Sequence, residues 1–266
     1  MNKYCQECGS KLQKHKTREL SNGDVSIQYK CSNCNSYITF HEEDLISNVS
    51  YNGGPKVLVF DIETAPLKSY VWRIWKENVG INQIVSDWYI MTWAAKWFGQ
   101  DEVYSDSLPY YKDVYENNPS DDRMLLVDMW KLLDEADIVV THNGDKFDIT
   151  KLNTRFLLAG MKPPSPYKSV DTLKVAKHLF NFTSNKLEYI AKFLGVGNKI
   201  DTGGFELWSD CLDGKMEAWD EMLRYNENDV IILENVYRKL RPWMKNHPNY
   251  NLYVDDYSVR CVASGS

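Results

Sequence analysis

The chain has 266 residues, 43% of them hydrophobic, and its 37 acidic residues against 31 Lys and Arg give a formal net charge of −6. This length and apolar content suffice for one sizeable domain with an appendage, and they exclude an intrinsically disordered protein. The acidic balance argues against coating of nucleic acid by bulk charge, and no apolar run approaches the ~18 residues of a membrane span, so we expect a soluble, cytoplasmic protein without a membrane partner.

Four of the six cysteines form two Cys-x-x-Cys pairs near the N-terminus, Cys5 with Cys8 and Cys31 with Cys34. Because the chain starts without an apolar signal segment, we expect these thiolates to hold one tetrahedral Zn²⁺ rather than to form disulfides or a redox pair. A segment this short has little core, so the metal would supply its folding free energy. We therefore predict a structural zinc ribbon over residues 1–50.

The basic stretch between the two cysteine pairs, KLQKHKTR, fits either a contact with a phosphate backbone or a solvated hairpin edge. The ribbon could thus contact a nucleic acid or a protein partner. Residues 51–55 end in Gly-Gly-Pro, which interrupts regular structure. We expect them to be a linker to a main domain over residues 56–266.

The run VLVFDIET, residues 57–64, is typical of a buried strand and ends with Asp61 and Glu63. Side chains two residues apart on a strand point to the same face, so these carboxylates stand side by side. Like charges this close repel unless something positive lies between them. The alternative is a strand that runs out into a polar loop.

The rest of the main domain alternates between strand-like and helix-like segments. Residues 121–136 have apolar residues at helical spacing (Met124, Val127, Trp130 and Leu133) and acids in the first turn, which predicts a helix. Strands then helices indicate a mixed α/β sheet flanked by helices, whose ligands gather at strand ends. The other strands are expected within 87–99, 102–108 and 137–143, and the other helices within 146–160, 170–180, 185–197 and Lys215–Lys239.

Two further acids lie where such a site would form. In THNGDKFD, residues 141–148, a strand ends in an Asn-Gly turn and Asp148 falls in the first turn of the next helix, where it could simply favour the helix dipole. In YNEND, Tyr225 and Asp229 are four residues apart and share one helical face. That face could be an exposed polar stripe, but flanking apolar residues indicate a packed helix whose polar patch faces a site.

The motifs D-I-E, N-G-x-x-F-D and Y-x-x-x-D, in this order, resemble the three exonuclease motifs of the DEDD superfamily of 3′-to-5′ exonucleases. The chain is most similar to the tyrosine branch, as in proofreading domains of family B DNA polymerases and stand-alone phage and bacterial nucleases. The resemblance implies a ribonuclease H-like fold. Arg224 stands where the histidine branch has its His, and we interpret His142 as a hydrogen-bonded strand-end residue and Asp171 as a helix N-cap.

By this resemblance, Asp61 would bridge two Mg²⁺ or Mn²⁺ ions, Glu63 and Asp229 would complete the first site, and Asp148 would hold the second. Tyr225 would orient the attacking water. The implied function is hydrolysis of phosphodiester bonds at single-stranded 3′ ends, DNA rather than RNA. Two alternatives stay open: an exoribonuclease of the same fold, and an inactive adaptor that binds nucleic acid. The 17 Tyr and 9 Trp could stack on bases, although most, such as Trp93 and Trp97, are expected in the sheet or core.

Overall fold

The computed structural model describes residues 12–19, 25–31, 33, 37–41 and 54–253. The chain divides into two compact units, Met1–Gly53 and Gly54–Ser266. The first contains an antiparallel sheet in the order β1-β2-β3, with β1 Leu12–Glu19, β2 Val25–Cys31 and β3 Tyr37–His41. Of the four predicted zinc ligands, Cys31 is buried at the end of β2, whereas Cys5, Cys8 and Cys34 lie outside the described residues.

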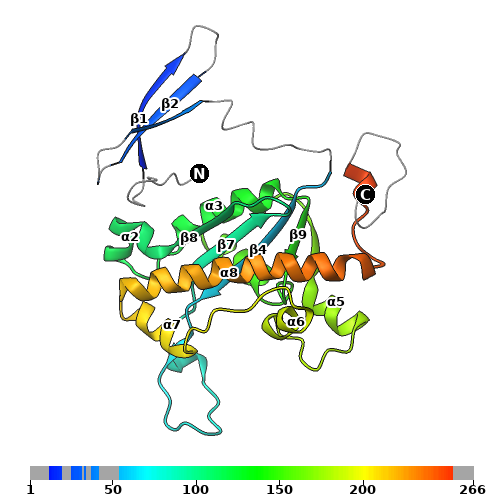
Figure 1. The fold of residues 1–266 in the computed structure, drawn as a ribbon. Helices are drawn as coiled ribbons and strands as arrows, with labels where there is room; N and C mark the ends of the chain where they lie inside the picture. The colour runs from blue at the N-terminus through cyan, green and yellow to red at the C-terminus, as the bar shows by residue number, and fades with distance from the viewer. Residues whose placement is uncertain (1–11, 20–24, 32, 34–36, 42–53, 254–266) are drawn as a thin grey trace. The chain divides into compact units, whose positions relative to one another are not determined.

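The second unit is built on a five-stranded mixed sheet in the order β10-β9-β4-β7-β8 (Figure 1). The central strand β4 pairs antiparallel with β7 and parallel with β9, while β9 pairs parallel with β10 and β7 antiparallel with β8. This arrangement confirms the predicted mixed α/β sheet flanked by helices. The strands are β4 Val57–Thr64, β7 Ile90–Trp97, β8 Val103–Ser107, β9 Ile138–Thr141 and β10 Lys168–Asp171.

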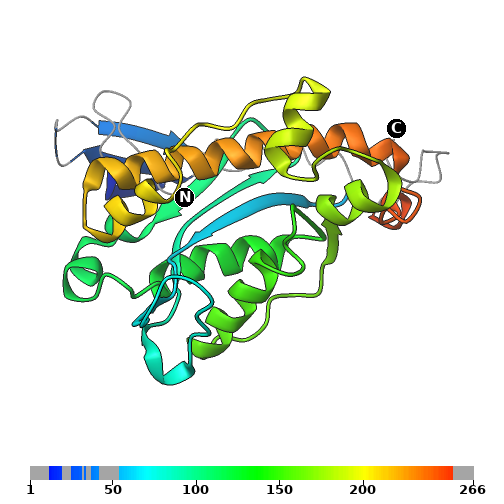
Figure 2. The same ribbon diagram turned by 90° about the horizontal axis from the view of Figure 1, so that it is seen from below.

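Helices cover both faces of this sheet. Figure 2 shows the long helix α8 (Met216–Leu240) along one face, and α3 (Arg123–Glu135) with α4 (Asp148–Leu158) against the other. None of the described helices has the length and apolar content that crossing a membrane requires. The remaining elements are α2 Lys112–Asn117, α5 Thr172–Leu179, α6 Leu187–Leu194, α7 Phe205–Leu212, the short strands β5 Lys68–Ser69 and β6 Ile84–Ser86, and the 3₁₀ turns η1 Ile81–Gln83, η2 Leu108–Tyr110, η3 Arg241–Trp243 and η4 Tyr250–Tyr253.

Strand β4 is apolar on both sides because it lies at the centre of the sheet. Leu58 and Phe60 pack into the core that contains side chains of α3 and α4. Val57 and Val59 point the other way and pack into the core that contains side chains of α8. Since side chains alternate along a strand, the positions that continue the Val57 and Val59 series face α8.

Helix α3 forms where the sequence predicts it, but of the four spaced apolar residues only Leu133 lies on its fully buried face. Met124 and Val127 are exposed, and the buried stripe consists of Leu125, Leu126, Met129 and Leu133. Apolar residues occupy more than half of the helix circumference, so two neighbouring stripes have the same helical spacing. Contact with the sheet decides between them, and that contact is not visible in the pattern.

Candidate metal centre

Strand β4 and helix α8 together bring three carboxylates into one cluster. Asp61 and Glu63 continue the face of β4 that points towards α8, and Asp229 lies on α8, which packs against β4. One oxygen from each carboxylate lies within 4.8 Å of the others. Asp61 and Glu63 on β4 are therefore close in space to Asp229, which lies far from them in the sequence.

The N-terminus of α4 places Asp148 beside this cluster. The buried Asp148 carboxylate accepts a hydrogen bond from the backbone N–H of Ile62, which lies between Asp61 and Glu63, at 3.2 Å. Asp148 is not part of the three-carboxylate group, but it is near enough to affect the ionisation of Asp61. Three of the four predicted acids thus converge, and the fourth holds the strand that carries two of them.

The turn between β9 and α4 fixes where Asp148 begins its helix. Asn143 has a φ of +73°, and its N–H donates a hydrogen bond to the Asp171 carboxylate at 2.8 Å. Asp171 also accepts hydrogen bonds from the backbone of α5, as predicted for an N-cap. A Cβ on Gly144 would lie 2.3 Å from Oγ1 of Thr141, so only glycine fits this close approach.

A buried asparagine that the sequence analysis missed orients Asp61. The side-chain N–H of Asn226 on α8 donates a hydrogen bond to Oδ2 of Asp61 at 2.8 Å, and its Oδ1 accepts one from the Thr92 hydroxyl at 3.0 Å. Asn226 is fully buried. It is the residue after Tyr225, but its place on the inner face of α8 emerges only from the packing of that helix.

A lysine, also missed, lies against the acids on α8. The Lys199 ammonium donates hydrogen bonds to the Tyr225 hydroxyl, at 2.8 Å, and to the Asp229 carboxylate. Burial lowers the pKa of Lys199, but Asp229 more than offsets this and raises it overall. Lys199 comes from the connection between α6 and α7, and no motif in the sequence marks that segment.

His142 lies at the strand end, where the sequence analysis placed it. Its ring nitrogens are each 2.9 Å from a partner, the Thr172 hydroxyl and the backbone carbonyl of Asn185. Burial lowers the pKa of His142. Both ring nitrogens are thus engaged in contacts that hold the chain, as expected for a hydrogen-bonded strand-end residue.

The carboxylates of the cluster resist ionisation. Burial raises the pKa of Asp61 well above its usual range, and the Asp148, Glu63 and Asp229 carboxylates raise it further. The pKa of Glu63 rises to about 8, through burial and through Asp229, and burial raises the pKa of Asp148 to about 7. The pKa of Asp229 is also raised by burial, although Lys199 opposes this. Four ionised carboxylates in this space require positive charge among them.

This arrangement fits divalent cations. Mg²⁺ and Mn²⁺ take oxygen ligands that converge from several elements, as these carboxylates do. Oδ1 of Asp229 is buried and, among the described residues, has no hydrogen-bond partner. An unpaired buried carboxylate oxygen next to two other carboxylates is the expected condition of a metal ligand.

Three comparisons relate the chain to known proteins. A family model described as RNase_H superfamily matches residues 94–241, more than half of the chain, a range that includes Asp148, Tyr225 and Asp229 and begins after Asp61 and Glu63. The chain is 36% identical over 77 residues to the DNA polymerase III PolC-type of Ureaplasma parvum serovar 3, a match that covers 29% of this chain and 5% of the polymerase.

Among solved structures, the chain is similar to the family B DNA polymerase from the hyperthermophilic archaeon Pyrobaculum calidifontis. The TM-score is 0.52 with 17% sequence identity, over 88% of this chain and 29% of the polymerase chain. At this identity the likeness concerns the fold. The chain spans less than a third of either polymerase.

Proposed function

Because the chain belongs to the RNase_H superfamily, we propose that it is a two-metal-ion 3′-to-5′ exonuclease that hydrolyses the phosphodiester bonds of single-stranded DNA. The observation that carries the proposal is the convergence of Asp61, Glu63 and Asp229 within 4.8 Å, with Asp148 beside them. The similarity to the DNA polymerase III PolC-type supports DNA as the substrate, and the motifs of the tyrosine branch support the 3′-to-5′ direction.

In this proposal the four acids would hold two Mg²⁺ or Mn²⁺ ions, whose charge would balance the four carboxylates when a phosphodiester approaches. The bound ions would supply positive charge to the attacking and leaving oxygens of an in-line displacement. Asn226 holds Asp61 in one orientation, and the backbone of Ile62 does the same for Asp148. Tyr225 would orient the attacking water through its hydroxyl.

Lys199 contributes a positive charge beside Asp229. Its ammonium is in contact with Asp229 and Tyr225, so it holds both side chains of the YNEND motif in place. Burial raises the pKa of Tyr225 to about 12, so its hydroxyl stays protonated at neutral pH. A neutral phenol donates a hydrogen bond to water and competes poorly with carboxylates as a metal ligand.

The proposal is tested with end-labelled single- and double-stranded DNA and RNA in Mg²⁺, Mn²⁺ or EDTA. We expect stepwise shortening of single-stranded DNA from its 3′ end with either metal and none in EDTA. Faster degradation of RNA than of DNA would show that RNA is the preferred substrate. Release of the 5′ label first would contradict the 3′-to-5′ direction.

Two variants assign the activity to the cluster. Asp61→Asn keeps the shape of the side chain and removes a charged ligand, so it should abolish degradation while the protein stays folded. Asp220→Asn, an exposed acid on the same helix as Asp229, is the matched control and should retain the wild-type rate. Full activity of Asp61→Asn would overturn the proposed centre.

A further inference from the structure

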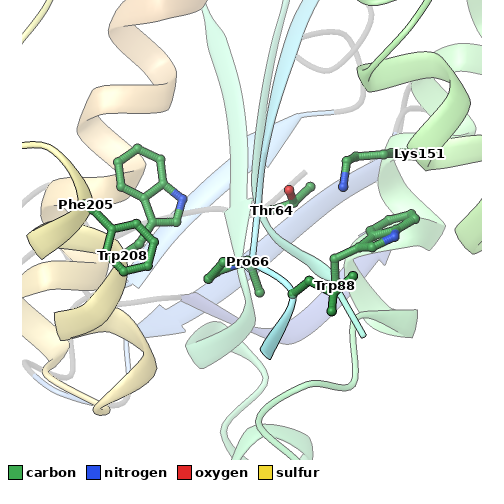
Figure 3. Close-up of a pocket in the computed structure, with 8 residues that line it drawn as sticks. Thr64, Pro66, Trp88, Lys151, Phe205 and Trp208 are labelled. Atoms are coloured by element: carbon green, nitrogen blue, oxygen red, sulfur yellow. The ribbon is translucent and has the colours of Figure 1, made fainter. Parts of the chain in front are cut away.

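An aromatic pocket opens next to the carboxylate cluster. It has a volume of about 520 Å³ and is lined by Thr64, Ala65, Pro66, Leu67, Trp88, Lys151, Phe205 and Trp208. Figure 3 shows Phe205 and Trp208, from α7, on one side of the pocket and Trp88 with Lys151 on the other, with Thr64 and Pro66 between them. The size lies within the range of pockets that bind small organic groups.

The pocket is continuous with the cluster along two elements. Thr64 is the last residue of β4 and follows Glu63 directly. Lys151 lies three residues after Asp148 on α4, which is about one helical turn. The Lys151 ammonium lies 3.7 Å from the centre of the Trp88 ring, so it adds positive charge to an aromatic wall. If a phosphate of a nucleic-acid strand lay at the carboxylate cluster, the neighbouring nucleotide would lie at this pocket.

The segment between two pocket residues, Leu67 and Trp88, forms a projecting arm, residues 68–86. Strands β5 and β6 pair antiparallel at its base, and Tyr70 and Gln83 exchange two hydrogen bonds, both of 2.9 Å. Figure 1 shows this segment, in cyan, extending away from the sheet. The arm is thus an ordered hairpin with both ends in the wall of the pocket.

The arm exposes aromatic and aliphatic side chains to an unusual degree. Trp72 is 93% exposed, Trp75 is 81% exposed, and Ile74 between them is 86% exposed. Arg73 and Lys76 alternate with these side chains, and the arm has three cations and one acid in a chain that is acidic overall. An exposed apolar patch of this kind marks an interaction surface.

We propose that the pocket and the arm form one binding track for an unpaired nucleic-acid strand: a base next to the carboxylate cluster stacks in the pocket, and the following bases stack on Trp72 and Trp75. The inference rests on the proposed function and extends it to the strand beyond the reacting end. Aromatic rings with interleaved cations are how proteins hold single strands without reading sequence, because every base has a face to stack. The bases of a duplex are already stacked on each other and cannot use such a track.

The charge pattern and the continuity of the arm with the pocket favour a strand over a protein partner. Arg73 and Lys76 are exposed, as the two tryptophans are, and can therefore contact a phosphate backbone. Glu77 lies 3.4 Å from Arg73 and orients its guanidinium without cancelling the positive charge of the arm. A surface that binds only a protein does not require that both ends of the arm lie in the wall of the pocket, whereas a strand that runs from the pocket onto the arm does.

The test measures equilibrium binding of fluorescent oligothymidylates to full-length Asp61→Asn in EDTA, so that no substrate is consumed. The double variant Trp72→Ala with Trp75→Ala should bind an oligonucleotide of about 20 residues roughly tenfold or more weakly, and one of about 4 residues with nearly unchanged affinity. Trp208→Ala, in the pocket, should weaken both. Trp243→Ala, which removes another largely exposed tryptophan outside the track, is the matched control and should weaken neither.

A second variant tests the charge separately. Lys76→Gln leaves the tryptophans in place and should reduce the slope of log affinity against log salt by a little under one, the loss of one phosphate contact. Thermal unfolding of the two arm variants should match that of Asp61→Asn, because Trp72, Trp75 and Lys76 are all exposed.

Several results would overturn the track. Unchanged affinity of the arm variant for the longer strand would do so, as would tighter binding of duplex than of single strands. The track would also be overturned if the arm variant turned an oligomeric protein into a monomer and kept its affinity for the strand. The arm would then be a contact between copies of the chain. Binding through the arm by a wild-type protein that degrades no nucleic acid would refute the proposed function and leave the track standing.

Discussion

Tyr225 and Asp229 are four residues apart on α8, share Lys199 as a partner and should nevertheless fail in different ways. Tyr225→Phe removes one hydroxyl and leaves the ring and all four acids, so we expect a rate about 10²-fold lower or less with unchanged metal affinity. Asp229→Ala removes a charged ligand, so both rate and metal affinity should fall, with partial rescue by high Mn²⁺. Single-turnover assays over a metal titration measure both quantities.

The role of Tyr225 has a direct competitor in His142. The hydrogen bonds that His142 makes to Thr172 and Asn185 assign it to structure, so His142→Ala should lower stability more than rate. A wild-type rate for Tyr225→Phe together with a folded but inactive His142→Ala would make His142 the proton acceptor instead.

Asn226 offers a test of orientation without a change of charge. Asn226→Ala removes the hydrogen bond to Asp61 and leaves the Thr92 hydroxyl without its buried partner. We expect stability to fall by about 1–3 kcal/mol and the metal affinity to fall as well. Asn228→Ala, on the same helix, loses only a hydrogen bond to the backbone of Asn198 and should change neither strongly. Urea unfolding and metal titration distinguish the two, and equal metal affinity in both variants would contradict the role of Asn226.

The raised pKa of Glu63 predicts a pH dependence of stability in EDTA. At low pH Glu63 is protonated in both the folded and the unfolded chain and has no effect on the difference between them. As the pH rises from about 4.5 towards 8, the unfolded chain releases this proton first, so the folded state loses stability. Glu63→Gln should therefore unfold at a higher temperature than wild type near pH 8 and at the same temperature near pH 4. Parallel thermal midpoints over this pH range would contradict the shift.

The acids of the centre were visible in the sequence because short motifs carry them, whereas their supports were not. Asp61 and Glu63 lie in the second half of a strand whose first half is buried, and the period of two residues puts them on one face without further information. Asn226 and Lys199 act through contacts across the fold, with Asp61 and with Asp229. Such contacts depend on how α8 packs and on the path of the chain between α6 and α7, which local patterns do not encode.

At the scale of elements, the N-terminus of α4 can be tested with one substitution. Gly144→Ala would place its Cβ 2.3 Å from Oγ1 of Thr141, a buried side chain at the end of β9. We expect a loss of about 1–3 kcal/mol in unfolding free energy and a lower rate, because the start of α4 must move and Asp148 with it. Urea unfolding and single-turnover rates measure the two effects.

Gly160→Ala, just beyond the other end of α4, is the control. Gly160 has a φ of +70° and no atom within 4 Å of its added Cβ, so the cost is limited to backbone strain of about 1–2 kcal/mol. The rate should stay at the wild-type level. Equal loss of rate in both glycine variants would mean that α4 acts through stability alone.

The long helix was the most predictable element, whereas some of the short elements were missed. Helix α8 was expected over Lys215–Lys239 and runs over Met216–Leu240, because 25 residues give the helical period room to show. The strand β10 and the helix α7 were missed. Strand β10 has four residues, and α7 follows two glycines, Gly203 and Gly204, that resemble a loop.

At the scale of the whole molecule, the predicted zinc ribbon can be separated from the proposed nuclease. Elemental analysis should find about one Zn²⁺ per chain, and Cys31→Ser should lose it. A truncation that starts near Asn52 should keep its activity on short oligonucleotides, since every acid of the centre lies beyond it. Protein without zinc would contradict the first expectation, and a folded but inactive truncation would contradict the second.

Contacts of β4 with α8 and with α4 join residues that are far apart in the sequence and are therefore synthesised at different times. Asp61 and its partner Asn226 are 165 positions apart, and Ile62 and Asp148 are 86 apart. A nascent chain whose synthesis has not reached α8 therefore has an uncovered apolar sheet face and lacks Asp229. Exposed apolar surface of this kind is what chaperones bind during translation. The order of synthesis thus delays the carboxylate cluster, because a ribosome-bound chain that ends before α8 lacks Asp229.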